Sequence, residues 1–116
     1  MNGSEWPAQD HRFDSTSIDN RYGITVTNGH VTQISLDGNN LSGDIPLMSH
    51  LSQLQSFSMV GNHIHNITNY AFSGLGNLQY LWLSSNEVAE ISRTAFAGMS
   101  GLLNLDLSTN QIMGIS

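Results

Sequence analysis

Two aromatic residues that could anchor a ligand, Tyr80 and Trp82, stand two positions apart and alternate with Leu81 and Leu83. Alternation of this kind is typical of a strand with one face against a core, so we expect the leucines to point inward and the aromatic rings outward. Exposed Tyr and Trp side chains often centre binding sites, because each combines a large apolar ring with a hydrogen-bonding group. The alternative is that Trp82 only packs against neighbouring strands.

The histidines are the residues that could bind a metal or transfer protons: His11, His30, His50, His63 and His65. His63 and His65 flank Ile64, but the adjacent Asn62 and Asn66 are poor further ligands, and no carboxylate stands at ligand spacing in the sequence. We therefore expect solvated loop histidines and no metal site. The chain also has no glycine-rich phosphate loop and no distinctive Ser/His/Asp arrangement. No catalytic residue, cofactor or enzymatic activity is predicted.

The composition allows one small domain with a surface of uncharged polar groups. Of its 116 residues 39% are hydrophobic and 10% are charged, and the net charge is −6 with three basic residues, all arginine. Nucleic acid is not an expected partner, because phosphate binding uses clustered Lys and Arg side chains. The absence of cysteine excludes disulfides and thiolate ligands. No apolar run approaches the roughly 18 residues of a spanning helix, so no membrane insertion is expected.

An internal repeat organises most of the chain. Four segments, at residues 31–41, 54–64, 78–88 and 102–112, share the pattern L-x-x-L-x-L-x-x-N-x-L, with other apolar residues at some leucine positions. Their asparagines, Asn39, Asn62, Asn86 and Asn110, are 23, 24 and 24 residues apart. On this pattern the chain resembles the leucine-rich-repeat family from about residue 24 to its C-terminus. Regular spacing of this kind predicts a solenoid in which each repeat forms one coil.

The resemblance implies an α/β repeat solenoid in the form of a horseshoe arc. A parallel β-sheet would line its concave face, and short turns or 3₁₀ helix would form its convex face. The predicted divisions are an N-terminal arm at 1–22, a cap hairpin at 23–30 and four repeats over 31–116, at about 31–53, 54–77, 78–101 and an incomplete 102–116.

Each position of the pattern has a structural reason. The central alternation places one side of a short strand in the core. The last apolar residue of each pattern is expected to point inward after the chain turns: Leu41, Ile64, Val88 and Ile112. The four asparagines can both donate and accept hydrogen bonds, so we expect them to satisfy backbone groups at the turns and to stack as a ladder.

The second half of the repeats has two styles. The stretch 41–46 resembles the N-L-S-G-x-I-P segment of plant-type repeats, whereas 69–75 and 93–99 resemble the A-F-x-G-L segment of typical extracellular repeats. Phe72 and Phe96 occupy the same place in consecutive repeats, so we expect their rings to stack beneath the convex surface.

The N-terminal end of the solenoid has a predicted cap. The Asn28-Gly29 pair predicts a type I′ hairpin between strands at 24–27 and 30–34. This hairpin resembles the W-x-G-V-x-C element of plant-type caps, with Arg21 in place of the tryptophan and Val26 in place of the cysteine. The apolar residues expected to pin the preceding arm onto the solenoid are Trp6, Phe13 and Ile18.

The sequence stops inside the fourth repeat without a polar closing segment. A solenoid end without a cap exposes its core, so we expect either a fragment of a longer protein or an end that another molecule covers.

The solvent-facing positions of the predicted sheet define the expected site. They are rich in Ser, Thr, Gln and Asn, which suits hydrogen bonds to a peptide backbone or to sugar hydroxyls. We predict a non-enzymatic module that binds a protein or peptide on its concave sheet, and a carbohydrate ligand also fits this chemistry. The predicted ligand-binding residues are Gln33, Gln55, Ser58, Tyr80, Trp82, Asn104 and Asp106.

The alternative function is structural. The uncovered C-terminal coil would dock on the N-terminal hairpin of the next copy, and a head-to-tail contact of this kind builds a filament or surface layer. Resemblance to extracellular repeats implies an extracellular or cell-surface location. Two N-x-S/T sequons lie within the repeats, at Asn40 and Asn66, and are the expected N-glycosylation sites, although the Asn, Ser and Thr content yields this many sequons by chance.

Overall fold

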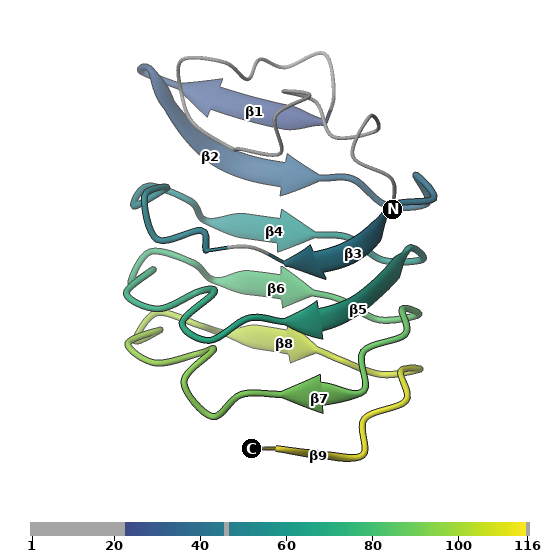
Figure 1. Ribbon diagram of the computed structural model, residues 1–116. Helices are drawn as coiled ribbons and strands as arrows, with labels where there is room; N and C mark the ends of the chain where they lie inside the picture. The colour runs from purple at the N-terminus through teal and green to yellow at the C-terminus, as the bar shows by residue number, and fades with distance from the viewer. Residues whose placement is uncertain (1–22, 46, 116) are drawn as a thin grey trace.

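The computed structural model describes residues 23–45 and 47–115, and this part of the chain is a stack of β-coils (Figure 1). The predictions made for the arm at 1–22, including Trp6, Phe13 and Ile18, for Arg21 and for Pro46 lie outside the described residues. The strands are β1 (Ile24–Thr27), β2 (His30–Ser35), β3 (Ser42–Ile45), β4 (Ser56–Ser58), β5 (His63–Ile67), β6 (Tyr80–Trp82), β7 (Glu90–Ile91), β8 (Asn104–Asp106) and β9 (Gly114–Ile115).

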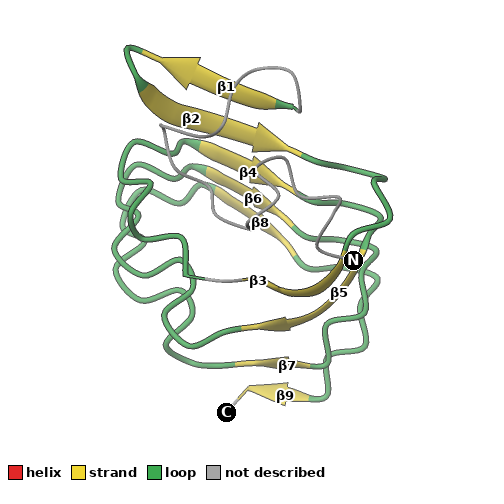
Figure 2. Ribbon diagram, turned by 45° about the horizontal axis from the view of Figure 1, so that its top comes forward, coloured by secondary structure: helices red, strands yellow, loops and turns green. Residues whose placement is uncertain are grey.

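The strands form two sheets on opposite sides of the coils (Figure 2). The sheet with strand order β1-β2-β4-β6-β8 is called the long sheet here, and the sheet with order β3-β5-β7-β9 the short sheet. From β2 onward the long sheet is parallel and in register with the repeat, because Ile34, Phe57, Leu81 and Leu105 align on successive strands. The predicted parallel sheet of repeat coils is thereby confirmed.

The opposite side of the coils differs from the prediction of short turns or 3₁₀ helix. It carries the parallel short sheet, and no helix occurs in residues 23–45 or 47–115, so the fold is a β-solenoid and the α/β assignment was wrong. Ile45 aligns with Ile67, and Ile67 with Ile91. Extended segments that occupy the same position in successive repeats therefore pair with one another. The stretch 69–75 forms consecutive short turns, as predicted, closed by the bonds from Ala71 N to Thr68 O, from Ser73 N to Tyr70 O and from Leu75 N to Phe72 O, but no 3₁₀ helix. The horseshoe arc stays a prediction.

One continuous core lies between the two sheets. Leu81 and Leu83 are fully buried, as the alternation predicts. The Phe72 ring lies 5.5 Å from that of Phe57 and 6.1 Å from that of Phe96, and the Phe72 and Phe96 planes differ by only 3°. The expected stack of Phe72 on Phe96 is confirmed.

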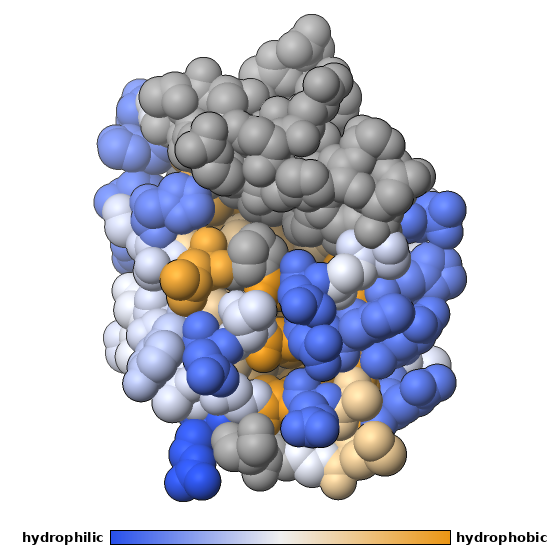
Figure 3. Space-filling view, in the orientation of Figure 1, coloured by the Kyte–Doolittle hydropathy of each residue, from blue (hydrophilic) through white to orange (hydrophobic). Residues whose placement is uncertain are grey.

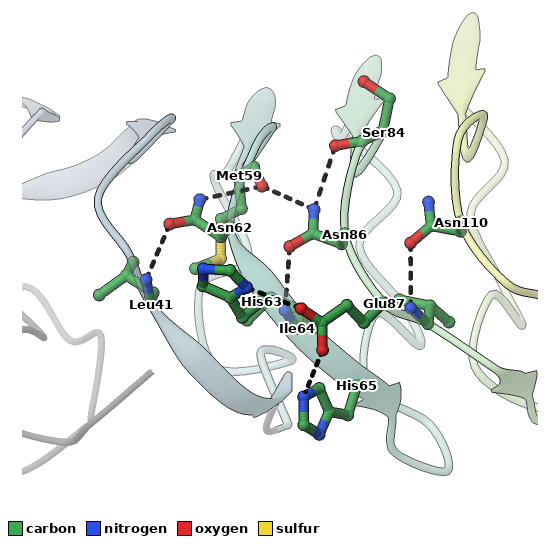
Figure 4. A network of polar contacts seen from close by, with 11 residues as sticks. Leu41, Met59, Asn62, His63, Ile64, His65, Ser84, Asn86, Glu87 and Asn110 are labelled. Carbon is green, nitrogen blue, oxygen red and sulfur yellow. Dashed lines mark hydrogen bonds and ion pairs between the residues drawn. The ribbon is translucent and has the colours of Figure 1, made fainter.

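The turn asparagines hold one coil to the next. Asn62 Oδ1 accepts hydrogen bonds from Leu41 N at 2.9 Å and Asn39 N at 3.0 Å, while its amide donates to Leu36 O and Met59 O at 3.0 Å. Asn86 and Asn110 repeat the pattern one and two coils later (Figure 4), with Oδ1 accepting from Ile64 N and Val88 N at 3.0 Å.

Asn39 departs from the predicted ladder. Its side chain is exposed, and among the described residues it donates to Asp37 O alone, within its own turn. The described element before this coil is the hairpin, which presents no turn of the repeat type to the Asn39 side chain.

The long sheet begins with the antiparallel pair β1 and β2. The strands pair from Ile24 opposite Ile34 to Thr27 opposite His30, with a register shift after Thr25. The connecting residues Asn28 and Gly29 both have positive φ, 52° and 80°, as a type I′ turn requires.

The last described coil is less covered than the others. Leu105 aligns with buried Leu81 but is 44% exposed, and Ile112, expected to point inward, is 39% exposed. These side chains pack against a neighbouring coil on one side only, since β8 is the edge strand of the long sheet.

Candidate functional site

The aromatic pair lies on β6, the strand between β4 and β8 of the long sheet. Leu81 is fully buried while Tyr80 is 37% exposed and Trp82 is half-buried, so both rings lie on the solvent side as predicted. Their centroids are 5.5 Å apart and their planes differ by 37°. The indole Nε1 donates a hydrogen bond of 2.8 Å to Asn104 Oδ1 on β8. The Trp82 ring is therefore held across two strands, and its packing does not remove Tyr80 from solvent.

On the solvent side of the long sheet, Tyr80 and Trp82 each belong to a row of side chains that runs across the strands. The register defines these rows: one row is Gln33, Ser56, Tyr80 and Asn104, and the next is Ser35, Ser58, Trp82 and Asp106. Gln55, exposed, precedes the first row on its coil. The predicted residues thus share one face, and their role in ligand binding stays a prediction.

Ser58 is not the solvent-facing residue that alternation predicts. It is only 4% exposed, and its hydroxyl donates a hydrogen bond of 2.6 Å to Asp37 Oδ1. The same oxygen accepts from Val60 N at 2.8 Å. Ser58 therefore positions the Asp37 carboxylate and offers little surface to a ligand.

Asp106 holds a carboxylate beside Trp82. Its Oδ1 accepts hydrogen bonds from Ser108 Oγ at 2.6 Å and Ser108 N at 3.0 Å. The Ser108 hydroxyl, and next its backbone N–H, lower the pKa of the Asp106 carboxyl, because both bonds favour the ionised form. At neutral pH this position on the long sheet therefore carries a negative charge.

A second polar cluster consists of His63 and His65 on β5 of the short sheet and Glu87 on the next coil, beside the asparagine ladder (Figure 4). Glu87 Oε2 is 2.7 Å from His63 Nδ1, and Glu87 Oε1 is 2.9 Å from His65 Nε2. The hydrogen bond from His63, followed by the attraction of both imidazoles, lowers the pKa of the Glu87 carboxyl. The two imidazoles are exposed as expected, but they lie on β5 and not in a loop, and a carboxylate bridges them.

Glu87 was not predicted from the sequence as a functional residue, and Asp37 is not among the predicted ligand-binding residues. Glu87 follows Asn86 as His63 follows Asn62, so the repeat alignment itself places these two residues on adjacent coils. The alternation of the pattern places Asp37 on the solvent side with Gln33 and Ser35, but its bond from the buried Ser58 has no signal in the sequence.

The two sequons lie on exposed backbone. Asn40 is exposed, with a φ of 58°, and Asn66 is exposed on β5 with its amide donating to Asp44 Oδ1 at 3.1 Å. The face that carries the short sheet is largely hydrophilic, with hydrophobic side chains confined to narrow patches (Figure 3).

Residues 23–45 and 47–115 contain neither a metal-binding cluster nor a helix that could span a membrane. No group of three or more His, Cys, Asp or Glu side chains there is arranged to hold a metal ion, which includes the His63, His65 and Glu87 cluster. In the same part of the chain, no helix has the length and apolar character needed to cross a membrane.

The stacked parallel coils and the asparagine ladder define a repeat solenoid. A family model described as leucine rich repeat matches residues 52–112, which is more than half of the chain. The chain belongs to the leucine-rich-repeat family. Domains of this family generally serve as protein-interaction modules and are typically not enzymes. Comparisons with curated proteins and with solved structures gave no significant match.

Proposed function

We propose that this chain is a non-enzymatic recognition module that binds a protein or peptide on the solvent side of the long sheet, around Tyr80 and Trp82. The observation that carries the proposal is the Trp82 ring held by Asn104 at 2.8 Å beside the exposed Tyr80 ring. A ring ordered before binding costs less conformational entropy when a ligand arrives, and aromatic anchors of this kind dominate the energy of many interfaces.

The composition of the surrounding face supports a peptide ligand. Gln33, Gln55 and Asn104 are exposed around the rings and can exchange hydrogen bonds with a peptide backbone. A carbohydrate would use the same groups, so it is the competing ligand class for this face. We further propose an extracellular or cell-surface location, with Asn40 and Asn66 as glycosylation sites.

The test is selection of linear peptides from a random displayed library on the purified chain, with binding then measured on synthetic peptides. Trp82→Ala and Tyr80→Ala should each weaken binding roughly tenfold or more, as expected for a hot spot. Tyr70→Ala is the matched control, because Tyr70 is 53% exposed but lies outside the long sheet. Binding that Trp82→Ala and Tyr70→Ala change equally would refute the proposal.

The second candidate function is association between copies of the chain. It is favoured by the apolar side chains of the last described coil, where Leu103 is 71% exposed and Met113 is 83% exposed. Light scattering over a range of concentrations decides it: growing polymers that Leu103→Ser and Met113→Ser suppress would support association. A monomer at every concentration would exclude it.

A further inference from the structure

Among the residues that the structure describes, the solvent side of the long sheet carries negative charge without compensating positive charge. Asp37 and Asp106 both lie on it, whereas Arg93, the single basic residue other than histidine between 23 and 115, follows β7 of the short sheet. The nearest imidazole on these strands is His30, at the hairpin end of β2. The whole chain has the same imbalance, with three basic residues against nine acidic ones.

Each of the two carboxylates keeps one oxygen for a ligand. In Asp37 and in Asp106 the hydrogen bonds converge on Oδ1, from Ser58 and Val60 in the first case and from Ser108 in the second. Neither Oδ2 has a hydrogen-bond partner among the residues that the structure describes. The bonds to Oδ1 fix each carboxylate in position, so Oδ2 can accept a charge-assisted bond without further ordering of the side chain.

Asp106 and Trp82 are placed to hold one cation together. They are register partners on adjacent strands, and strand spacing separates such partners by about 5 Å. An ammonium or guanidinium group bonded to Asp106 Oδ2 would lie within the roughly 6 Å reach of a cation–π contact with the indole. The Trp82 ring is already directed toward β8 by its bond to Asn104.

Asp37 lies at the other end of the same face. Asp37 is three strand spacings from Asp106, which is about 14 Å across the sheet, and it lies two residues further along the strand direction. The diagonal distance between the two aspartates is therefore roughly 16 Å. An extended peptide advances about 3.4 Å per residue, so this diagonal corresponds to four or five residues, roughly. The aromatic pair on β6 lies between the two carboxylates.

We propose that the ligand of the long sheet is an extended peptide segment with two Arg or Lys residues four or five positions apart. One cation binds Asp106 Oδ2 over the Trp82 ring, the other binds Asp37 Oδ2, and the peptide crosses the strands beside Tyr80. This inference rests on the proposed function and adds the chemistry of the ligand to it.

The experiment uses the peptides selected from the random displayed library. The expected result is enrichment of Arg or Lys pairs at the stated separation, with affinity that falls as salt rises. Replacing the selected arginines by citrulline, a neutral isostere, and the variant Asp106→Asn should each weaken binding roughly tenfold. Asparagine keeps an Oδ1 acceptor for Ser108, so Asp106→Asn removes the charge while retaining the local fold. Asp44→Asn is the matched control, since Asp44 is an exposed carboxylate on the short sheet.

The outcomes separate this inference from the proposed function. Peptides that need Trp82 but lack basic residues, or that bind Asp106→Asn unchanged, overturn the inference and leave the proposed function standing. Equal losses for Asp106→Asn and Asp44→Asn indicate unspecific attraction and also overturn it. If no selected peptide depends on Trp82, or if Trp82-dependent binding occurs only on an array of neutral glycans, both proposals fall.

Discussion

Trp82 on β6 donates a hydrogen bond of 2.8 Å from its indole Nε1 to Asn104 Oδ1 on β8. The bond crosses from one coil to the next on the solvent side of the long sheet. It orders the largest aromatic ring of this face without burying it, which distinguishes a ring held for binding from one that fills the core.

Loss of this bond should free the ring while leaving the fold intact. Because both partners are solvent-accessible, Asn104→Ala should lower the free energy of unfolding by less than about 1 kcal/mol. In a Trp6→Phe background, where Trp82 is the sole tryptophan, its fluorescence anisotropy should fall. Asn77→Ala, which removes another exposed bond between coils (3.1 Å to Ser52 O), is the control and should leave the anisotropy unchanged.

The buried asparagine ladder should contribute strongly to stability. Asn62→Ala would leave Leu41 N and Leu36 O unpaired in the core, whereas Met59 O keeps its hydrogen bond from Asn86, so we expect a loss of about 3 kcal/mol in the free energy of unfolding. Urea denaturation measures the effect. Asn39→Ala, at the exposed first position, should change the free energy by no more than ~0.5 kcal/mol. Similar losses at the two sites would contradict the ladder geometry.

The stacked phenylalanines should behave as core residues of unequal weight. Phe72 is fully buried between Phe57 and Phe96. Phe72→Ala removes this filling from a closed site, so it should cost about 3–5 kcal/mol, whereas Phe96→Ala should cost less because Phe96 is half-buried. Thermal and urea unfolding of the two variants test the order, and a larger effect for Phe96→Ala would refute it.

A close approach of two glycines should make one alanine substitution much worse than the other. A Cβ on Gly101 would collide with the backbone oxygen of Gly76, whereas a Cβ on Gly76 would meet Ser100 Oγ at an ordinary 3.6 Å. Gly101→Ala should therefore lower the free energy of unfolding by roughly 1–3 kcal/mol. Gly76→Ala should leave it nearly unchanged or raise it slightly, since alanine restricts the unfolded chain. Equal unfolding midpoints for the two variants would rule out the close packing of these coils.

The Glu87 cluster predicts an acid-dependent loss of stability. The pKa of Glu87 in the folded chain lies below its ordinary value of 4.5, so its contribution is fully present above that value. The contribution is lost as the pH falls from 4.5 through the lowered folded pKa, because the unfolded chain then binds the proton more readily. The difference in urea midpoint between the wild type and Glu87→Gln should therefore shrink over this interval.

Glu90→Gln provides the control for the acid-dependent effect. Glu90 is an exposed carboxylate on β7 without an imidazole partner among the described residues. Its difference from the wild type should change less than that of Glu87→Gln over the same interval. A Glu87→Gln difference that stays constant down to the lowest pH at which the chain folds would contradict the assigned role of the cluster.

The repeat pattern by itself determined the coil and its inward residues. Leu81, Leu83, Ile64 and Val88 are buried as predicted, and Asn62 is bonded as predicted. These features follow from the type of each residue and from its position within one coil. The sequence shows both, because the repeat has a regular length. The alternation also identified Tyr80 and Trp82 correctly as residues of the solvent side.

Tertiary structure alone decided the features that depend on neighbouring coils. The short sheet forms because extended segments of successive coils pair with one another, although each is too short to signal a strand by itself. Burial of Ser58 and the bond from Trp82 to Asn104 depend likewise on which side chains meet across the strands. Residue type and periodicity determine what faces the core, but the contacts between coils determine which of the remaining side chains are free to bind a ligand.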